Sequence, residues 1–317
     1  MRLARLLEKH YGLRAQSVAR VSEGVGGEVY VVEADAGRFV LKGTEKSDLR
    51  AQKEPHIVEY AARHDIPVPE FLPTKDGGWF FYNNRKQYNL RPYMEGTVYS
   101  YGEAPDWLMG ESACMQGRIH AALAGFGPLT QALGPDFPGF LRSDAPRASY
   151  ARTLALAKKA GDTSVIEDIE YRLARLHTLQ ERGYDCDRFT VGNTHGDYKV
   201  QNLVCGEGRI AAVIDWTSAC ALPLCLEVIR AYSHAAPALS IEGLRAYAEE
   251  YRRFAPLNDY DLEMMPWVFR DLLLASDYYG QYYASKSRNR ADYLAQARFA
   301  TGVLRWLEEA LPGVLPL

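Results

Sequence analysis

The spacing of apolar residues divides the chain into a strand-rich first part and a mainly helical remainder. Up to about residue 92, short runs rich in β-branched and aromatic residues are separated by glycines and prolines, which is typical of antiparallel strands. These predicted strands are residues 17–22, 28–33, 38–42, 69–74, 78–82 and 88–93. A short amphipathic helix is predicted before them at residues 3–11. A second helix is predicted among them at residues 53–64 and is ended by the P-V-P of residues 67–69.

Beyond residue 92, apolar residues recur every three or four positions, which predicts helices. The predicted helices are residues 104–126, 148–159, 164–182, 240–254, 259–283 and 292–311, with another that begins soon after Pro223. A loop rich in Pro and Gly is expected at residues 134–146. Residues 203–205 and 209–214 are predicted to form a hairpin around the G-E-G of residues 206–208. The pattern as a whole predicts an α+β chain with a small antiparallel sheet and a larger helical part.

Two short motifs in the second part combine residues suited to phosphoryl transfer. Residues 194–202 read T-H-G-D-Y-K-V-Q-N, which supplies His195, Asp197 and Asn202, and residues 213–216 read V-I-D-W, which supplies Asp215. Phosphoryl transfer to an alcohol needs a carboxylate for the hydroxyl proton, together with an amide oxygen and a second carboxylate for magnesium. Asn202 and Asp215 lie at the two ends of the predicted hairpin, so we expect them to face each other.

The combination of HGDYKVQN and VIDW resembles the aminoglycoside phosphotransferase / choline kinase superfamily, whose members are small-molecule kinases that share the protein-kinase core. The resemblance implies a bilobal, protein-kinase-like fold, with a nucleotide-binding lobe at residues 1–92 and a catalytic and acceptor-binding lobe at residues 93–317. It implies Asp197 as the catalytic base, Asn202 and Asp215 as magnesium ligands, and ATP or GTP as the phosphoryl donor. We expect His195 to hold the loop by hydrogen bonding.

Lys199, two residues after Asp197, has two interpretations. A lysine at this offset stabilises the migrating phosphoryl charge in Ser/Thr protein kinases, which would make Lys199 a catalytic residue. The alternative is a solvated loop lysine.

Residues 23–28 read E-G-V-G-G-E, and Gly24, Gly26 and Gly27 would let backbone amides approach phosphate oxygens. A plain hairpin turn explains the same glycines. Lys42, at the end of F-V-L-K, has the place of the strand lysine that pairs with nucleotide phosphates in kinases, although a solvated lysine is the simpler alternative. The superfamily spacing favours Glu54 over Glu59 as its acidic partner.

The segment L-R-P-Y-M-E-G, residues 90–96, resembles the hinge between the two lobes of these kinases. By alignment, the Pro92 carbonyl and the Met94 amide would bind the adenine edge. His120 is interpreted as a packed structural residue. Glu227 stands where the superfamily often carries an Asp, which leaves open whether it anchors the loop of Asp197.

Residues near the end of the chain allow two interpretations of the acceptor site. Asp277 and Tyr278, Tyr279, Tyr282 and Tyr283 could enclose a cationic amine. A helix face packed into the core is the alternative, and the helical spacing of the tyrosines favours it.

Composition narrows the possible partners. The 317 residues are 47% hydrophobic and 24% charged, with a formal net charge of −3, which is ordinary for a globular protein. Without a long basic run, binding to nucleic acid or to an anionic membrane is not expected. The first ten residues lack the apolar centre of a signal peptide, and the five scattered cysteines form no C-x-x-C pair. We therefore expect a cytoplasmic protein.

The predicted function is an ATP- and Mg²⁺-dependent phosphotransferase that acts on a hydroxyl of a small molecule. The acceptor would be an aminoglycoside, choline, homoserine or a sugar-like alcohol. One alternative is a catalytically weak nucleotide-binding scaffold of the same fold, like the spore-coat-associated members. A protein kinase is a less favoured alternative, since the long activation segment is absent.

Overall fold

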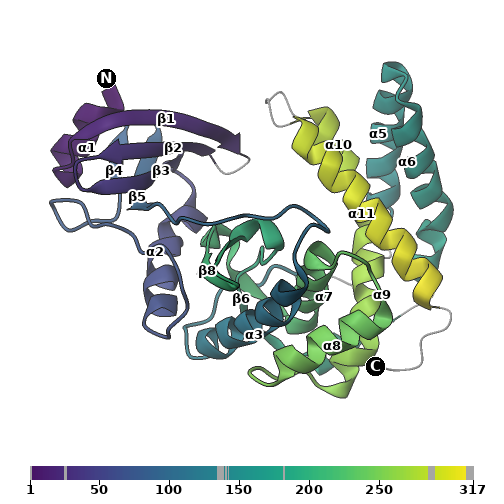
Figure 1. Cartoon of the computed structure of the whole chain (residues 1–317). Helices are drawn as coiled ribbons and strands as arrows, with labels where there is room; N and C mark the ends of the chain where they lie inside the picture. Colours follow the sequence, from purple (N-terminus) through teal and green to yellow (C-terminus); the bar gives the residue numbers. More distant parts are fainter. Residues whose placement is uncertain are drawn as a thin grey trace.

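A sheet-containing small lobe and a larger, mainly helical lobe make up the structure (Figure 1). The computed structural model describes residues 2–24, 27–133, 139, 141, 143–180, 183–284 and 290–311. Within them, no helix combines the length and the apolar character that crossing a membrane requires. The two lobes, one containing a sheet and the other mainly helical, confirm the predicted α+β, bilobal fold class.

The small lobe is built on five antiparallel strands in the order β1-β2-β3-β5-β4. Their bounds are β1 Ala15–Gly24, β2 Gly27–Ala34, β3 Gly37–Glu45, β4 Phe81–Asn83 and β5 Lys86–Pro92, and α1 spans Arg2–Tyr11. The strand predicted at residues 69–74 is wrong. Pro69 and Pro73 have no N–H to donate to a ladder, and this segment reaches the sheet through one bond from the Leu72 amide to the Leu90 carbonyl.

Helix α2, Leu49–Ala62, links the small lobe to the large one. It begins earlier than predicted because Asp48 caps it, accepting hydrogen bonds from the Arg50 and Ala51 amides. The early start places Pro55 in the second turn rather than in the first turn that its type favours. The buried Ile57, Val58 and Ala61 of α2 belong to the large lobe's hydrophobic cluster.

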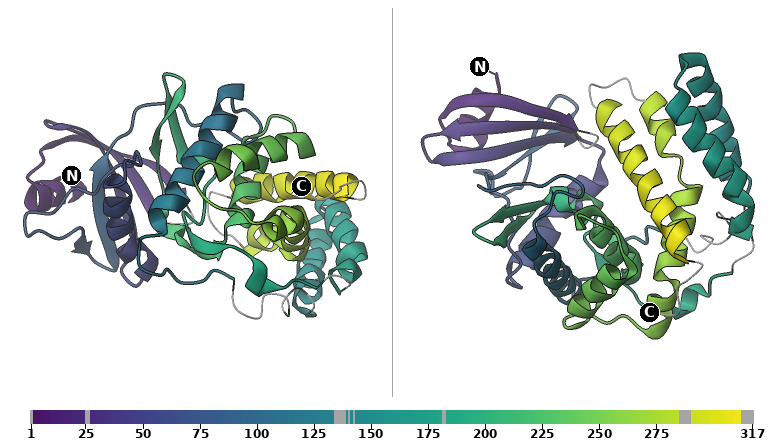
Figure 2. Two further views of the ribbon diagram at one scale, coloured as in Figure 1. Left: turned by 90° about the horizontal axis from the view of Figure 1, so that it is seen from below. Right: turned by 45° about the vertical axis from the view of Figure 1, so that its right-hand side comes forward.

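Eight described helices form most of the large lobe. They are α3 Asp106–Leu123, α5 Ala145–Ala160, α6 Thr163–Arg175, α7 Leu224–Ala235, α8 Ile241–Arg252, α9 Asp259–Ala275, α10 Tyr278–Ala284 and α11 Arg290–Ala310. Helices α5, α6, α10 and α11 stand together on the side of this lobe away from α2 (Figure 2).

Two helix predictions for the large lobe need correction. The helix predicted at residues 259–283 is divided, because Asp277 starts a new helix by accepting a hydrogen bond from the Gly280 amide. The helix predicted at residues 164–182 ends at Arg175 and continues as the 3₁₀ helix η1, Leu176–Gln180. Most of the loop predicted at residues 134–146 lies outside the described residues, and α5 already begins at Ala145.

Two pairs of short strands in the large lobe carry the loops that matter most. Strands β7, Leu203–Gly206, and β8, Arg209–Val213, form the predicted antiparallel hairpin. Strands β6, Val191–Thr194, and β9, Cys220–Pro223, also pair, although no strand was predicted there. The chain between β6 and β7 forms the HGD loop, residues 195–202. The chain between β8 and β9 contains the DWT loop, residues 215–218.

A short connecting segment, residues 93–97, joins the lobes and is held at both ends. At the end next to the small lobe, the Tyr93 amide donates to the Arg38 carbonyl at 3.0 Å. At its lower end Thr97 and Cys205 exchange backbone hydrogen bonds of 2.7 and 2.8 Å. Gly96 has φ +153°, and a Cβ there would lie 2.6 Å from the Cys205 carbonyl oxygen, so this close contact requires glycine.

Candidate active site

His195 shapes the HGD loop from within. Its ring is fully buried, Nε2 lies 3.0 Å from the Ile214 carbonyl oxygen, and Nδ1 lies 3.3 Å from the Asp197 amide nitrogen. A carbonyl can only accept and an amide N–H can only donate, so the proton is assigned to Nε2 and the ring is neutral. Through these two contacts His195 joins the Ile214 carbonyl to the backbone of Asp197.

Gly196 follows in a conformation that a larger residue resists. Its φ is +79°, and an added Cβ would lie 1.9 Å from the Ser218 carbonyl oxygen in the DWT loop. The Gly196 carbonyl accepts a hydrogen bond of 2.9 Å from Arg230 Nη1 on α7. Glycine at this position therefore lets the HGD and DWT loops pass within contact of each other.

Glu227 on α7 supports the HGD loop from below, which answers the question that its sequence position left open. The side chain is fully buried, and Oε1 accepts a hydrogen bond of 3.4 Å from the Tyr198 amide. Oε2 lies 2.7 Å from His120 Nε2, while His120 Nδ1 lies 2.7 Å from the Tyr251 hydroxyl. Burial raises the pKa of Glu227, but the hydrogen bond and charge of His120 outweigh it and lower the pKa to about 2.

Asp197 is contacted by two other polar side chains of the HGD loop. Lys199 Nζ lies 2.8 Å from Asp197 Oδ2, and Asn202 Nδ2 donates to the same oxygen at 3.1 Å. Asn202 Nδ2 also donates to the Asp197 main-chain carbonyl at 2.8 Å. Among the described residues, Asp197 Oδ1 has no hydrogen-bond partner, so it is available to accept one from a ligand hydroxyl.

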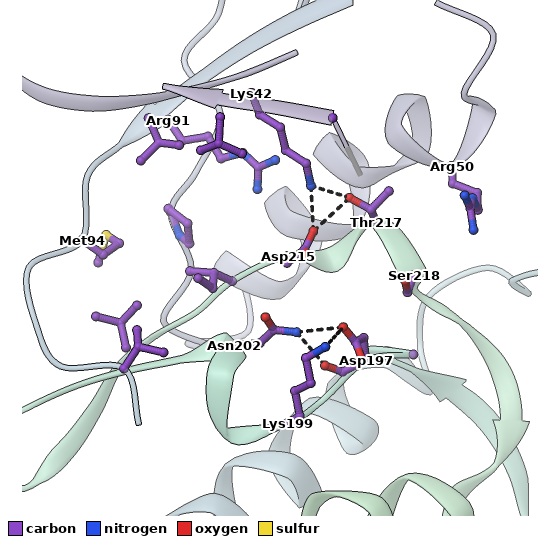
Figure 3. Close-up of a pocket in the computed structure, with 18 of the residues that line it drawn as sticks. Lys42, Arg50, Arg91, Met94, Asp197, Lys199, Asn202, Asp215, Thr217 and Ser218 are labelled. Carbon is purple, nitrogen blue, oxygen red and sulfur yellow. Dashed lines mark hydrogen bonds and ion pairs between the residues drawn. The ribbon is translucent and has the colours of Figure 1, made fainter. Parts of the chain in front are cut away.

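Lys42 extends from β3 to the DWT loop (Figure 3). Its Nζ lies 2.7 Å from Asp215 Oδ1 and donates to Thr217 Oγ1 at 2.9 Å. Asp215 has a left-handed backbone with φ 64°, which is uncommon for a residue other than glycine. Burial raises the pKa of Asp215, yet the nearby ammonium of Lys42 more than offsets this and holds the pKa at about 2.

The predicted ion pair between Lys42 and Glu54 is wrong. The fully buried Glu54 binds Arg91 of β5 through two parallel hydrogen bonds, 2.9 Å to Oε1 and 3.1 Å to Oε2. The planar guanidinium matches both carboxylate oxygens, whereas an ammonium is a point donor. Glu54 also accepts hydrogen bonds from the Trp216 amide at 3.2 Å and the Thr217 hydroxyl at 3.0 Å. Glu54 thus restrains the DWT loop, and Lys42 pairs with Asp215 instead.

The polar side chains line one cleft of about 1070 Å³ between the lobes. Figure 3 shows Lys42 directed at Asp215 and Thr217, while Lys199 and Asn202 converge on Asp197. The lining residues include all the predicted chemical side chains except His195 and Glu54, namely Lys42, Asp197, Lys199, Asn202 and Asp215. Pro92 and Met94 of the predicted hinge line it as well.

The glycines of the β1–β2 turn have a structural explanation. Gly24 pairs with Gly27 at the end of the hairpin, and Gly26 lies outside the described residues. Gly27 lines the cleft, and a Cβ on it would lie 2.1 Å from the Gly43 carbonyl oxygen of β3. Close packing of β2 on β3 therefore requires Gly27, whether or not phosphate binds there.

The acid and tyrosines suggested for an acceptor site form part of the packing between helices. Asp277 Oδ2 accepts hydrogen bonds from Ser149 at 2.8 Å and Thr153 at 2.6 Å, both on α5. Tyr279 is buried and donates to Asp168 on α6. Other residues at this end line the cleft, namely Tyr101, Gln281, Asp292, Tyr293 and Gln296.

Two side chains of the cleft suit a magnesium ion. The described residues contain no group of three or more His, Cys, Asp or Glu side chains positioned to hold a metal by themselves. Asn202 uses its amide nitrogen on Asp197, and Figure 3 shows its amide oxygen on the side of Asp215. One amide oxygen and one carboxylate are the donor set expected where phosphates and water complete a magnesium site.

Three residues of the site escaped the sequence analysis. Arg91 binds Glu54, Thr217 binds Lys42, and Arg230 binds the HGD loop. Each is a common residue type outside the two motifs, and its partner is distant in sequence. Thr217 alone had a local signal, since it lies two residues after Asp215.

A phosphotransferase is the class of protein that this fold and site define. Residues 17–262 match the phosphotransferase enzyme family, so the chain belongs to that family. This agrees with the family resemblance identified from the HGDYKVQN and VIDW motifs. No curated protein matches the chain.

Solved structures show the same fold at low sequence identity. Spectinomycin phosphotransferase in complex with ADP and spectinomycin is 13% identical over 97% of this chain and 98% of its own, with a TM-score of 0.65. Amicoumacin kinase in complex with AMP-PNP, Ca²⁺ and Ami is 15% identical over 96% of this chain and 93% of its own, with a TM-score of 0.63. Macrolide 2′-phosphotransferase from Brachybacterium faecium is 20% identical over 94% and 97%, with a TM-score of 0.55.

Proposed function

We propose that this phosphotransferase moves the γ-phosphoryl group of ATP or GTP to a hydroxyl of a small molecule. Residues 1–92 would bind the nucleotide, and residues 93–317 would supply the catalytic groups and bind the acceptor. The observation that carries the proposal is the meeting of four side chains in one cleft. Lys42 comes from the small lobe, and Asp197, Asn202 and Asp215 come from the large lobe.

The connecting segment and Lys42 would bind the nucleotide. Because the Tyr93 amide bonds to Arg38, Pro92 faces Phe39 in a non-hydrogen-bonded pair, and its carbonyl points away from β3. That carbonyl and the Met94 amide would bind the adenine edge, with the Lys42 ammonium at the phosphates. The bound ADP and AMP-PNP in the spectinomycin and amicoumacin enzymes support a nucleotide in this family's cleft.

Asn202 and Asp215 would hold Mg²⁺, which neutralises the charge that develops on phosphate oxygens. Asp197 would orient the acceptor hydroxyl through Oδ1 and accept its proton as the new O–P bond forms and the bond from the γ-phosphorus to the departing nucleoside diphosphate breaks. Lys199 Nζ lies 2.8 Å from Asp197 Oδ2, where its ammonium would contribute positive charge beside the transferred group. His195 acts on the loop geometry and takes no proton.

The test is ADP release with ATP and Mg²⁺ across aminoglycosides, choline, homoserine and sugars, measured beside Asp197→Asn. At least one alcohol should stimulate ADP release more than about tenfold, and Asp197→Asn should lower that turnover about 10²- to 10⁴-fold. Nucleotide binding, followed by calorimetry, should survive in the variant. Binding without stimulated turnover in either protein would instead favour a nucleotide-binding scaffold.

A further inference from the structure

The cleft extends past Asp197 to a second end that the transfer chemistry does not use. This end is bordered by Tyr101, Gln281, Asp292, Tyr293 and Gln296. Burial raises the pKa of Tyr101 to about 12, and the negative charges of Asp197 and Asp292 contribute to the same shift. The charges of both acids, one on the HGD loop and one on α11, therefore act on the Tyr101 hydroxyl.

Tyr101 is held in place by two other rings, and together they form the aromatic wall (Tyr101, His234 and Phe299). The Tyr101 ring stacks on Phe299 with centroids 4.2 Å apart and an interplanar angle of 14°. His234 meets both rings edge-on, at 5.0 Å from Tyr101 and 4.9 Å from Phe299. Three mutually packed rings give Tyr101 little freedom, so its surface in the cleft is preformed.

His234 contributes to the wall as a neutral group. The half-buried side chain lies near the end of α7, and its buried Nδ1 has no hydrogen-bond partner among the described residues. Burial lowers the pKa of His234 well below its ordinary value, and the charges of Arg230 and Lys199 lower it further. The wall is thus uncharged, which suits the apolar face of a ring.

The polar groups that border the same end of the cleft indicate how much charge the acceptor carries. Gln281 and Gln296 offer neutral amides, and Asp292 is the single carboxylate among the described residues that border this end. Lys199 also lines the cleft, and its ammonium, 2.8 Å from Asp197 Oδ2, disfavours additional cationic groups close to Asp197. A polycation would need several acids at this end.

We propose that the acceptor is a ring-bearing polyol with at most one amine, which stacks on Tyr101, hydrogen-bonds to Gln281 and Gln296, and pairs its amine with Asp292. The proposal rests on the proposed kinase function and adds the class of acceptor. Stacking supplies most of the affinity for the acceptor because the Tyr101 ring is already held in place. The exposed Asp292 mainly supplies selectivity for an amine over a hydroxyl.

Matched acceptor pairs that differ by one amine test the proposal. Glucosamine and glucose form one pair, an aminocyclitol with one amine and its hydroxyl analogue form another, and kanamycin serves as the polycation. Asp292→Asn should lower the ratio of kcat/KM for the amine over its hydroxyl analogue about two- to fivefold. Glu249→Gln, an exposed acid on α8, is the charge-matched control and should leave that ratio unchanged.

Tyr101 gives the second measurement. Tyr101→Leu should raise the acceptor KM about fivefold with little change in kcat, whereas Tyr101→Phe should change it less than about twofold. Turnover of choline or homoserine without turnover of any ring acceptor would overturn this proposal and leave the kinase function standing. A preference for kanamycin over the acceptors with one amine would also overturn this proposal. The same holds if Asp292→Asn does not alter the ratio of kcat/KM for the amine over its hydroxyl analogue. No stimulated ADP release with any alcohol would count against both.

Discussion

The HGD and DWT loops lie side by side in the cleft but are held from different parts of the molecule. The HGD loop is supported within the large lobe, by Glu227 and Arg230 of α7 and by the Ile214 carbonyl. The DWT loop is held by charged side chains of the small lobe and α2, with Lys42 on Asp215 and Glu54 on Thr217.

This difference separates two parts of the proposed reaction. The position of the proposed base Asp197 depends on packing inside one lobe and should be insensitive to how the lobes are arranged. The position of the proposed metal ligand Asp215 depends on contacts that cross the cleft, so it should respond to nucleotide binding. Changes near the HGD loop should therefore lower kcat, and changes near the DWT loop should raise the KM for the nucleotide.

Gly196→Ala should have the largest effect. A Cβ at this position would lie 1.9 Å from the Ser218 carbonyl oxygen at a φ that disfavours alanine, so the loop must move. We expect kcat to fall about 100-fold or more, because misplacement of about 1 Å has that cost, and the free energy of unfolding to fall by about 2 kcal/mol. Gly206→Ala is the control, since a Cβ added at Gly206 would have no other atom within 4 Å among the described residues.

Glu227→Gln should lower kcat about 10- to 100-fold and leave the nucleotide KM nearly unchanged, since it weakens the support of Tyr198. It should also reduce the free energy of unfolding at pH 7 by about 2 kcal/mol. The pKa of Glu227 is depressed in the folded protein, so its stabilisation is present above about pH 4.5 and is lost as the pH falls toward 2. Urea unfolding should show the two proteins converging in that range, and a constant difference would contradict this assignment.

Arg91→Lys tests the support of the DWT loop. Lysine retains the charge but cannot bind both oxygens of Glu54, so the restraint on Trp216 and Thr217 should loosen. We expect the nucleotide KM to rise about fivefold, kcat to stay within about twofold, and the free energy of unfolding to fall by about 1 kcal/mol. Arg209→Lys on the exposed hairpin is the matched control. If Arg91→Lys lowered kcat as much as Glu227→Gln does, the proposed difference between the HGD and DWT loops would be wrong.

Thr217→Val should have the smallest effect. Its hydroxyl accepts from Lys42 and lies 3.0 Å from Glu54 and 3.2 Å from Asp215, while valine keeps the shape without the hydrogen bonds. We expect a rise of about two- to fivefold in the nucleotide KM, consistent with the loss of one hydrogen bond to a charged group. Thr217→Ser should restore the KM, and failure of serine to do so would point to packing instead.

Local motifs made much of this site predictable. His195, Asp197 and Asn202 lie on one loop, and the β7–β8 hairpin returns Asp215 to Asn202, so nearby sequence determined their proximity. The partner of Glu54, in contrast, could be either of two cations that are distant in sequence. Nothing in the sequence near Lys42 or Arg91 indicates which of them pairs with Glu54. Spacing alone could not decide between them.

The elements that prediction missed are also explained by long-range contacts. Strand β6 contains Gly192 and Asn193, which are poor strand formers, and its partner β9 lies well downstream. The break between α9 and α10 has no Gly or Pro, and the capping Asp277 was interpreted instead as a ligand or packing residue. These elements form because tertiary contacts override weak local preferences.

The fastened ends of the connecting segment determine where the molecule can bend. With Tyr93 bonded to β3 and Thr97 bonded to β7, the torsional freedom of this segment is concentrated in residues 94–96. Met94 would therefore combine contact with the adenine and a place in this unfastened stretch, so that filling the base pocket would stiffen it.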